Sequence, residues 1–185
     1  MSFEPLVFYW NFCVFSVNFF FFFNSSTGIF NREIYELANI EGAMEWTISG
    51  QDLFVRIDPG EEIHAAIQNL ADEIGIDAAA ITSGIGRTRE NTYGFMNDEG
   101  VYITSSLNSP GELISLSGNI SRKEDGKPFT HIHCCWSDDE NNVHAGHMFN
   151  ATVHVVAEIH IRIMKDVIMT RYALPDVALL GLRFS

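Results

Sequence analysis

The sequence predicts an α+β domain that is built mainly on an antiparallel β-sheet and carries one helix. Many short segments rich in β-branched and aromatic residues are separated by glycine-containing or acidic turns. Ile159, Ile161 and Ile163 alternate with polar residues, which is the pattern of a strand with one buried face. Residues 63–74 instead place apolar side chains at helical spacing. No internal repeat and no long linker divides the domain.

The length and composition narrow the classes of protein to which the chain can belong. Its 185 residues suffice for one ordinary domain with a hydrophobic core. The apolar fraction of 46% excludes wholesale disorder, and the net charge of −13 weighs against a protein that neutralises nucleic-acid phosphates. Three cysteines, two of them adjacent, make a poor disulfide framework. We therefore expect a reduced, cytoplasmic protein.

The first 43 residues differ from the rest of the chain. They hold ten of the fifteen phenylalanines, and residues 6–23 form an uncharged stretch long enough to cross a membrane. No lysine or arginine precedes this stretch, as a signal peptide would require. We favour the interpretation that residues 1–43 are a leader outside the domain, produced by a start codon assigned too early, with Met44 as the true start. A genuine membrane anchor is the alternative, and without it we expect no contact with a membrane.

The elements at the start of the domain are two strands and the helix. Residues 46–57 predict two short strands around a turn at residues 50–52. The helix should begin with Asp58 as its capping residue and Pro59 in its first turn. Gly75 is expected to end it in the left-handed conformation. The apolar face of this helix consists of Ile63, Ala66, Ile67, Leu70 and Ile74.

The remainder of the domain predicts strands. Residues 78–83 form an apolar strand that should end in a tight turn at residues 83–86. Further strands are expected at residues 91–96, 101–106, 112–121, 130–136 and 153–164. The domain is expected to span residues 44–172, which leaves residues 173–185 as a C-terminal tail.

Histidines near the middle of the domain form the pattern that is most informative about function. His131, His133 and Cys135 are two residues apart in a predicted strand, so their side chains point to the same face. The acidic turn at residues 138–142 can bring His147 back toward that face. Three imidazoles with a fourth position open are typical of a catalytic type of zinc site. Imidazoles also bind iron, nickel and copper, so the identity of the metal stays open; we expect a divalent ion, with zinc favoured.

Cysteines and arginines elsewhere in the domain have several interpretations. Cys135 could be a metal ligand, a neighbour that supports the ligands, or a small core residue, whereas Cys134 is expected in the core. Arg87 and Arg89 could contact an anion, although solvated turn residues are the commoner case. Ordinary sheet or surface positions are expected for three other histidines, His64, His154 and His160, the last of them facing solvent.

Six short motifs follow one another along the domain, at residues 54–63, 83–86, 112–120, 125–129, 131–133 and 146–147. With these motifs in this order, the sequence from about residue 45 to residue 171 resembles the PPC domain (plant and prokaryote conserved domain). The resemblance implies an α+β fold with an antiparallel sheet and assembly as a homotrimer. It also implies a metal bound by His131, His133 and His147, and the DNA-binding assignment that members of the family carry.

The sequence departs from the pattern of this family in several ways. Ala145 replaces the usual first glycine of a Gly-Gly-His turn, and Cys134 and Cys135 replace small or apolar residues. Plant members bind DNA through AT-hooks with Arg-Gly-Arg cores, and this sequence contains no such core. From Met44 onward, ten Lys or Arg stand against twenty Asp or Glu, a net charge of −10. DNA as a partner is therefore implied by the resemblance but disfavoured by charge and motif.

Three functions are open for the domain. The first is a homotrimeric PPC-domain protein with a three-histidine divalent-metal site and the DNA-binding assignment of its family. The second is a metal-dependent hydrolase or lyase that acts on a small molecule, in which Glu112 or Glu158 could serve as general base. The third is a trimeric interaction module that the metal only stiffens. Whether the protein is an enzyme is left open by these residues.

Overall fold

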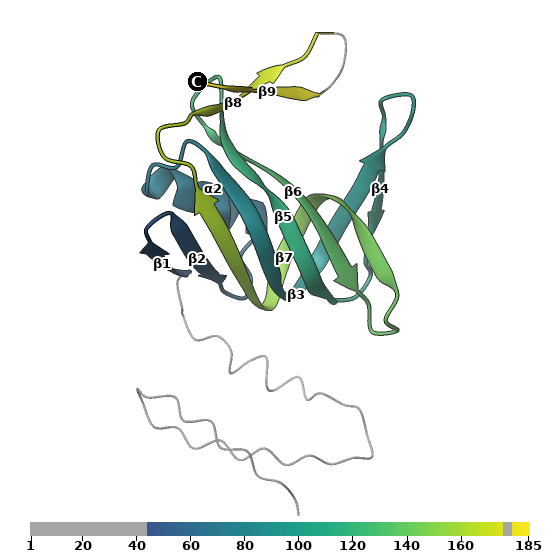
Figure 1. Ribbon diagram of the computed structural model, residues 1–185. Coiled ribbons are helices and arrows are strands. Elements are labelled where there is room, and N and C mark those ends of the chain that lie inside the picture. Colours follow the sequence, from purple (N-terminus) through teal and green to yellow (C-terminus); the bar gives the residue numbers. More distant parts are fainter. Residues whose placement is uncertain (1–43, 176–178) are drawn as a thin grey trace, which may run out of the picture.

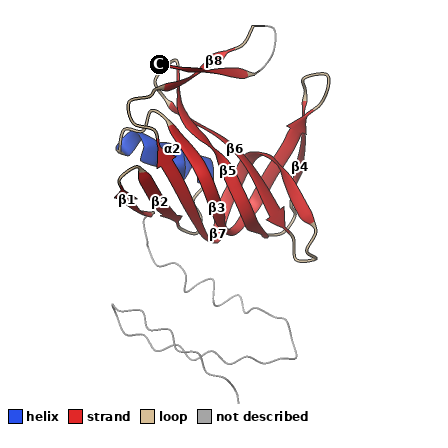
Figure 2. Ribbon diagram, in the orientation of Figure 1, coloured by secondary structure: helices blue, strands red, loops and turns tan. Residues whose placement is uncertain are grey.

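The computed structural model describes residues 44–175 and 179–185 (Figure 1). This part of the chain contains nine strands and one helix, so the predicted α+β class with a mainly antiparallel sheet is confirmed (Figure 2). The leader at residues 1–43 lies outside the described residues, and both interpretations of it stay predictions. Among the described residues, no helix has the length and apolar character needed to span a membrane. In chain order the elements are β1 (Glu45–Ser49), β2 (Asp52–Ile57), α2 (Ile63–Glu73), β3 (Ala79–Met96), β4 (Tyr102–Ser106), β5 (Gly111–Lys123), β6 (Pro128–Ser137), β7 (Val143–Ile163), β8 (Met169–Ala173) and β9 (Leu180–Phe184).

The helix begins later than the sequence suggested. Asp58 lies outside it and its carboxylate pairs with Arg56 at 2.9 Å, so the expected cap is wrong. Glu62 caps α2 instead, because its side chain accepts a hydrogen bond from the backbone N–H of Ala65 at 2.8 Å. Gly75, with a φ of +71°, follows the last turn in the left-handed conformation, as predicted.

Two strands are longer than predicted, because the turns expected within them do not form. β3 runs unbroken through residues 83–86, where the sequence suggested a tight turn. β7 includes both the expected strand at residues 153–164 and the segment that carries His147. Ala145 and Gly146 therefore belong to a strand and not to a turn. Register shifts within the β3–β7 pair let these long strands bend, so the glycines mark bends and close approaches rather than strand ends.

The strands form one strongly coiled sheet in which four strands close on one another. β3 pairs with β5 and β7, and β6 also pairs with β5 and β7, so these four strands make a ring of antiparallel pairs. β1 and β2 extend the sheet beyond β7, and β4 pairs with β3. The β8–β9 hairpin joins through a parallel pairing of β8 with β5 and stands at the top of Figure 1. The segment expected as a tail, residues 173–185, thus carries strand β9.

The core lies between α2 and the inner face of the sheet. Trp136 is its largest fully buried side chain, and its indole N–H donates to Thr88 Oγ1 at 2.9 Å. The Thr88 hydroxyl in turn donates to Asn91 Oδ1 at 2.7 Å, so the polar atoms in this part of the core are paired. Along β6 the buried residues alternate with His131 and His133. This alternation places both histidines on the face of the sheet opposite the core.

Candidate metal centre

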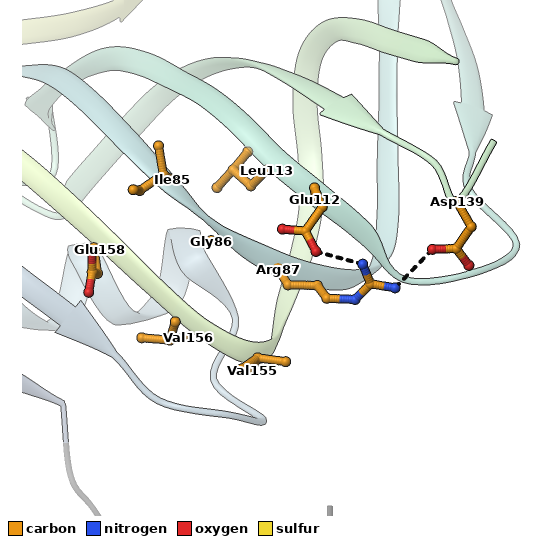
Figure 3. A pocket seen from close by; sticks show the side chains of 9 residues that line it. All are labelled: Ile85, Gly86, Arg87, Glu112, Leu113, Asp139, Val155, Val156 and Glu158. Carbon is orange, nitrogen blue, oxygen red and sulfur yellow. Dashed lines mark hydrogen bonds and ion pairs between the residues drawn. The ribbon is translucent and has the colours of Figure 1, made fainter. Parts of the chain in front are cut away.

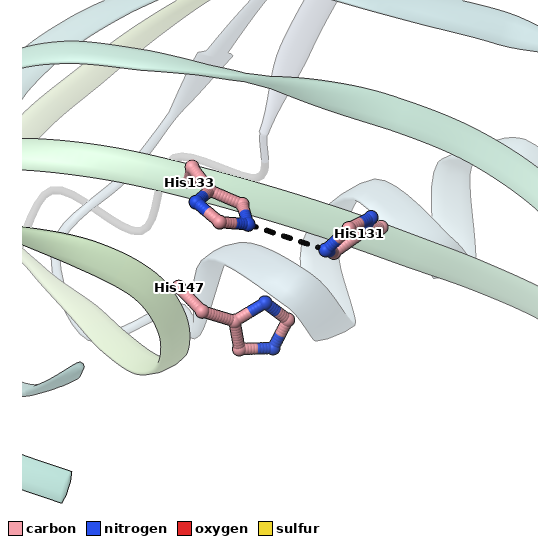
Figure 4. A group of neighbouring side chains, drawn as sticks. All are labelled: His131, His133 and His147. Carbon is pink, nitrogen blue, oxygen red and sulfur yellow. Dashed lines mark hydrogen bonds between the residues drawn. The ribbon is translucent and has the colours of Figure 1, made fainter. Parts of the chain in front are cut away.

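Three histidines come together where β6 and β7 begin to diverge (Figure 4). His131 and His133 lie on β6 and His147 lies on β7, as the sequence analysis expected. His133 and His147 are direct partners and form the last pair of the β6–β7 ladder. One ring nitrogen of each residue lies within 4.8 Å of the other two, and the Nε2 atoms of His131 and His133 are 3.3 Å apart. The three imidazoles therefore converge on one point.

A glycine allows β7 to reach this position. At the end of its ladder with β6, strand β7 begins to pair with β3, and His147 lies opposite Gly94. A Cβ atom on Gly146 would lie 2.6 Å from the carbonyl oxygen of Gly94, which is closer than such atoms approach in proteins. The close contact of the two backbones requires a residue without a side chain. The glycine that precedes His147 is therefore a packing requirement of the site.

Burial and nearby positive charges lower the pKa of two of these rings, those of His131 and His147. Desolvation, together with the neighbouring His131 and His133, lowers the pKa of His147 to about 4. Desolvation is also the main cause of the lowered pKa of His131, and the positive charge of Arg171 adds to it. At neutral pH both imidazoles are uncharged and offer a nitrogen lone pair. This is the form in which histidine binds a metal.

One atom of the cluster has no hydrogen-bond partner among the described residues. Among the described residues, Nδ1 of His147 is the single buried side-chain nitrogen or oxygen without a hydrogen bond. Leaving such an atom buried and unpaired costs about 1–3 kcal/mol. An ion held through this atom would remove that cost. Three imidazoles, of which that of His133 is exposed, fit a divalent ion with a fourth position open to solvent.

A family model described as the Plants and Prokaryotes Conserved (PCC) domain matches residues 45–165. The chain belongs to this family. The resemblance to the PPC domain, which rested on six ordered motifs, is thereby confirmed. Among curated proteins, none matches the chain.

Solved structures similar to this chain include proteins from bacteria and archaea. A metal-containing protein from Archaeoglobus fulgidus is 32% identical, has a TM-score of 0.65, and is matched over 75% of this chain and 96% of that chain. A plant- and prokaryote-conserved (PPC) protein from Pyrococcus horikoshii is 29% identical, with a TM-score of 0.63 and coverage of 77% and 96%. A "putative DNA binding protein" from Bacteroides thetaiotaomicron is 24% identical, with a TM-score of 0.70 and coverage of 77% and 99%. At that identity the last likeness concerns the fold alone.

Two aromatic side chains flank the histidines of this PPC domain and were not identified from the sequence. The ring centroid of Phe149, on β7, lies 4.8 Å from that of His147. The ring centroid of Tyr102, on β4, lies 5.3 Å from that of His147. The two rings also contact each other edge to face, with centroids 5.1 Å apart. They form an aromatic wall on the His147 side of the cluster.

His64, expected to be an ordinary histidine, links the two strands that carry the cluster. From α2, its Nε2 donates to the carbonyl oxygen of Met148 at 3.1 Å, since that oxygen can only accept. Its Nδ1 then accepts from the hydroxyl of Thr130 at 2.6 Å, and the side-chain amide of Gln68 donates to the same Thr130 oxygen at 2.8 Å. Met148 and Thr130 are each adjacent in sequence to a histidine of the cluster. The helix thus holds β6 and β7 in place just past the end of their ladder.

The cysteines and Arg89 lie outside the cluster. Cys135 is partly buried and is not among the residues whose ligand atoms converge, so a role as ligand stays a prediction. Cys134 is part of the core, where burial raises the pKa of its thiol. Arg89 forms an ion pair with Glu90 at 3.6 Å.

His154 and His160, both on β7, are not members of the cluster. His160 is less solvent-facing than predicted, with 32% of its side chain exposed. Its Nδ1 lies 2.6 Å from the hydroxyl oxygen of Thr82, and its Nε2 lies 3.3 Å from a carboxylate oxygen of Asp52. His154 is partly buried, and desolvation lowers its pKa. Both fit the expectation of ordinary sheet residues.

A separate cavity of about 820 Å³ lies over β3, β5 and β7 (Figure 3). Arg87 lines it and pairs with Glu112 at 2.6 Å and with Asp139 at 3.0 Å. Glu158 lies at the left of the view, on the side away from Asp139. The two carboxylates considered as general bases, Glu112 and Glu158, therefore line this cavity, whose lining includes none of the three histidines. Arg87, considered as an anion contact, already has two carboxylate partners.

Proposed function

We propose that this PPC domain binds one divalent metal ion, zinc in the first instance, through His131, His133 and His147, and offers its fourth position to a small molecule. The observation that carries the proposal is the convergence of three imidazole nitrogens within 4.8 Å on one face of the sheet. The buried, unpaired Nδ1 of His147 supports it. A relative that is 32% identical is a metal-containing protein, which supports it independently.

A fourth coordination position open to solvent favours a catalytic or ligand-binding metal site over a purely structural one. A divalent metal held there would polarise a carbonyl group or activate a water molecule. The three imidazoles would hold the ion, while Tyr102 and Phe149 would exclude water from one side. A metal-dependent hydrolase or lyase is the corresponding enzyme, and it would need a base other than Glu112 or Glu158. The metal-stiffened module has less support, because a closed site would need a fourth protein ligand and Cys135 is not in the cluster.

DNA binding, which the names of family members suggest, has weaker support. A surface that binds DNA needs cations free to neutralise phosphates. Seven of the ten Lys and Arg side chains in the described residues are instead paired with carboxylates, namely Arg56, Arg87, Arg89, Arg122, Lys127, Arg162 and Arg183. The domain also has twice as many acidic as basic residues. We therefore rank a small molecule ahead of DNA as the ligand.

We further propose that the chain assembles as a homotrimer in the cytoplasm, as the family resemblance and the lack of a disulfide framework suggest. Exposed apolar side chains on three neighbouring strands support self-association. Ile85, Ile114 and Val155 are 54%, 49% and 46% exposed. Light scattering on the purified protein should give three times the 20.8 kDa mass of one chain.

Elemental analysis of the full-length chain, purified without a histidine tag, tests the metal site. We expect about one zinc or other divalent ion per chain. The His133→Ala variant should lose most of this metal, and because His133 is exposed, the variant should still fold. His160→Ala is the matched control, since it removes a sheet histidine outside the cluster, and it should keep its metal.

Two outcomes would contradict the proposal. The first is wild-type protein that contains no metal and takes up none when dialysed against zinc sulfate. The second is equal metal content in His133→Ala and wild type, which would exclude the cluster as the binding site.

A further inference from the structure

Arg171, on β8, is a nearly buried cation that no carboxylate of the described residues neutralises. Only 8% of the surface of Arg171 is exposed. Nε donates to Ser121 Oγ at 3.3 Å, and Nη2 donates to Asn119 Oδ1 at 2.7 Å. The guanidinium carbon lies 5.6 Å from the ring centroid of Phe129. All three neighbours are uncharged, so within residues 44–175 and 179–185 the positive charge of Arg171 has no counter-ion.

This arrangement is unusual within the molecule itself. Seven of the other cations have carboxylate partners, although most of them are far more exposed than Arg171. Burial lowers the pKa of Arg171, yet a guanidinium stays protonated in proteins. Buried charges are normally paired, because removing a charge from water is unfavourable. An anion from outside the described chain would supply the missing partner.

The position of Arg171 directs that anion to the metal centre. Asn119, to which Arg171 bonds, is paired directly with His131 across the β5–β6 ladder. Side chains of directly paired residues lie on the same face of a sheet, so Arg171 lies beside His131. In agreement, the positive charge of Arg171 is the second-largest cause of the lowered pKa of His131, after desolvation. The cluster is thus bordered by a cation next to His131 and by the aromatic wall next to His147.

The guanidinium also has hydrogen-bond donors to spare. Nη1 makes no hydrogen bond to any described residue, and it is not among the buried unpaired atoms. It therefore keeps access to solvent. Nη1 and the second hydrogen of Nη2 can donate in parallel to the two oxygens of a carboxylate.

We propose that Arg171 is the anion-recognition residue of this site and that the ligand is a small organic acid. The carboxylate of this acid binds the guanidinium of Arg171, and the apolar part of the acid extends over the histidines toward Tyr102 and Phe149. A phosphate monoester offers the same oxyanion chemistry, and the experiment below separates the two. This inference rests on the proposed metal function, because the metal ion held by the three histidines would lie between Arg171 and the aromatic wall.

Calorimetric titration of the zinc-loaded, full-length chain tests this inference with three probes: benzoate, phenyl phosphate and the neutral benzamide. Benzoate should bind at least about tenfold more tightly than benzamide, because only the anion pairs with the guanidinium. Arg171→Gln should weaken benzoate binding by at least about tenfold, and Arg171→Lys, which keeps the charge but not the fork, should weaken it less. Arg183→Gln is the matched control, since Arg183 lies on the same hairpin but pairs with Glu124, and it should bind benzoate like wild type.

The comparison of benzoate with benzamide uses wild-type protein alone, so the inference is tested even if Arg171→Gln does not fold. Tighter binding of phenyl phosphate than of benzoate would assign a phosphate ester as the ligand class. Equal binding of benzamide and benzoate, no binding of either anion, or unchanged affinity in a folded Arg171→Gln variant would overturn the inference. Metal content is measured in the same samples. Metal without anion binding would refute the role of Arg171 alone, whereas failure to take up metal would refute the proposed function, and titration of the metal-free chain would then test Arg171 separately.

Discussion

His147 gives up its proton far more readily in the folded protein than in an unfolded chain, because burial and its histidine neighbours lower its pKa from 6.5 to about 4. Between these two pH values the unfolded chain binds more protons than the folded one. The free energy of unfolding of the metal-free protein should therefore fall as the pH drops from 6.5 to about 4. Urea unfolding of EDTA-treated protein at several pH values within this window would measure the fall.

The assignment of this pH dependence to His147 can be checked with a substitution that cannot titrate. His147→Gln should show a shallower loss of stability over the same pH window than wild type. His160→Gln, which changes a histidine outside the cluster, should keep more of the wild-type slope. A wild-type slope in His147→Gln would mean that other groups carry the acid sensitivity.

The residues of the site differ in how far their positions could be predicted from the sequence. The period of two along a strand sufficed to put His131 and His133 on one face. The acidic turn at residues 138–142 predicted a hairpin that would bring His147 beside them, and that hairpin forms. Arg171 reaches the site from β8, through a parallel pairing with β5 that no local pattern encodes. Tyr102 lies on β4, which forms a local hairpin with β3, but its approach to His147 depends on the path of β7 along β3. Their participation depends on the coiling of the whole sheet, so it could not be predicted from sequence spacing.

At the scale of elements, α2 holds together the fork between β6 and β7. The ladder between these strands ends at His133 and His147, and His64 bridges Thr130 and Met148 just beyond it. We predict that His64→Leu lowers the affinity for zinc by about 10–100-fold, because the bridge sets the separation of the strands that carry the ligands. Competition with a chromophoric chelator would measure the affinity.

A purely structural role for His64 would give a different result. Gln68→Leu removes the other hydrogen bond to Thr130 and should lower the free energy of unfolding while leaving zinc affinity within about threefold of wild type. Urea unfolding of both metal-free variants gives their stabilities. If the two variants lose zinc affinity in proportion to their loss of stability, His64 acts through the fold alone and does not position the ligands.

Some features of the strands and of the helix start could not be predicted from the sequence pattern. Most strand positions agree with the prediction, but β8 and β9 were not predicted, and the glycines within β3 and β7 belong to strands and not to turns. At Gly146 the glycine instead allows a second backbone to approach, which a single sequence does not reveal. Asp58 and Glu62 are both acidic residues near the helix start, and backbone pairing decides which of them is the cap. Gly60 and Glu61 form backbone hydrogen bonds with Val153 of β7, so the helix cannot begin before Glu62.

At the scale of the molecule, the distribution of charge bears on the choice between DNA and a small molecule. The acidic excess is accompanied by local pairing, so most cations are already neutralised by a carboxylate of the same chain. Among the described residues, the cations without such a pair are Lys123, Lys165 and Arg171. Arg171 is almost buried, and a flat duplex does not reach a buried group as a small anion does. Charge, burial and site geometry therefore point to the same class of ligand.

We predict from this distribution that zinc-loaded protein binds a DNA duplex of about 20 base pairs with a dissociation constant no tighter than about 100 µM at about 150 mM salt, the weak limit of non-specific binding. Fluorescence anisotropy of a labelled duplex would measure it. Any residual binding at low salt should decrease in Lys123→Gln, which removes an unpaired cation, and should persist in Arg162→Gln, whose cation is paired with Asp52. A micromolar affinity that falls steeply with the logarithm of the salt concentration would contradict the prediction. It would also require that assembly of several chains gathers the few free cations onto one surface.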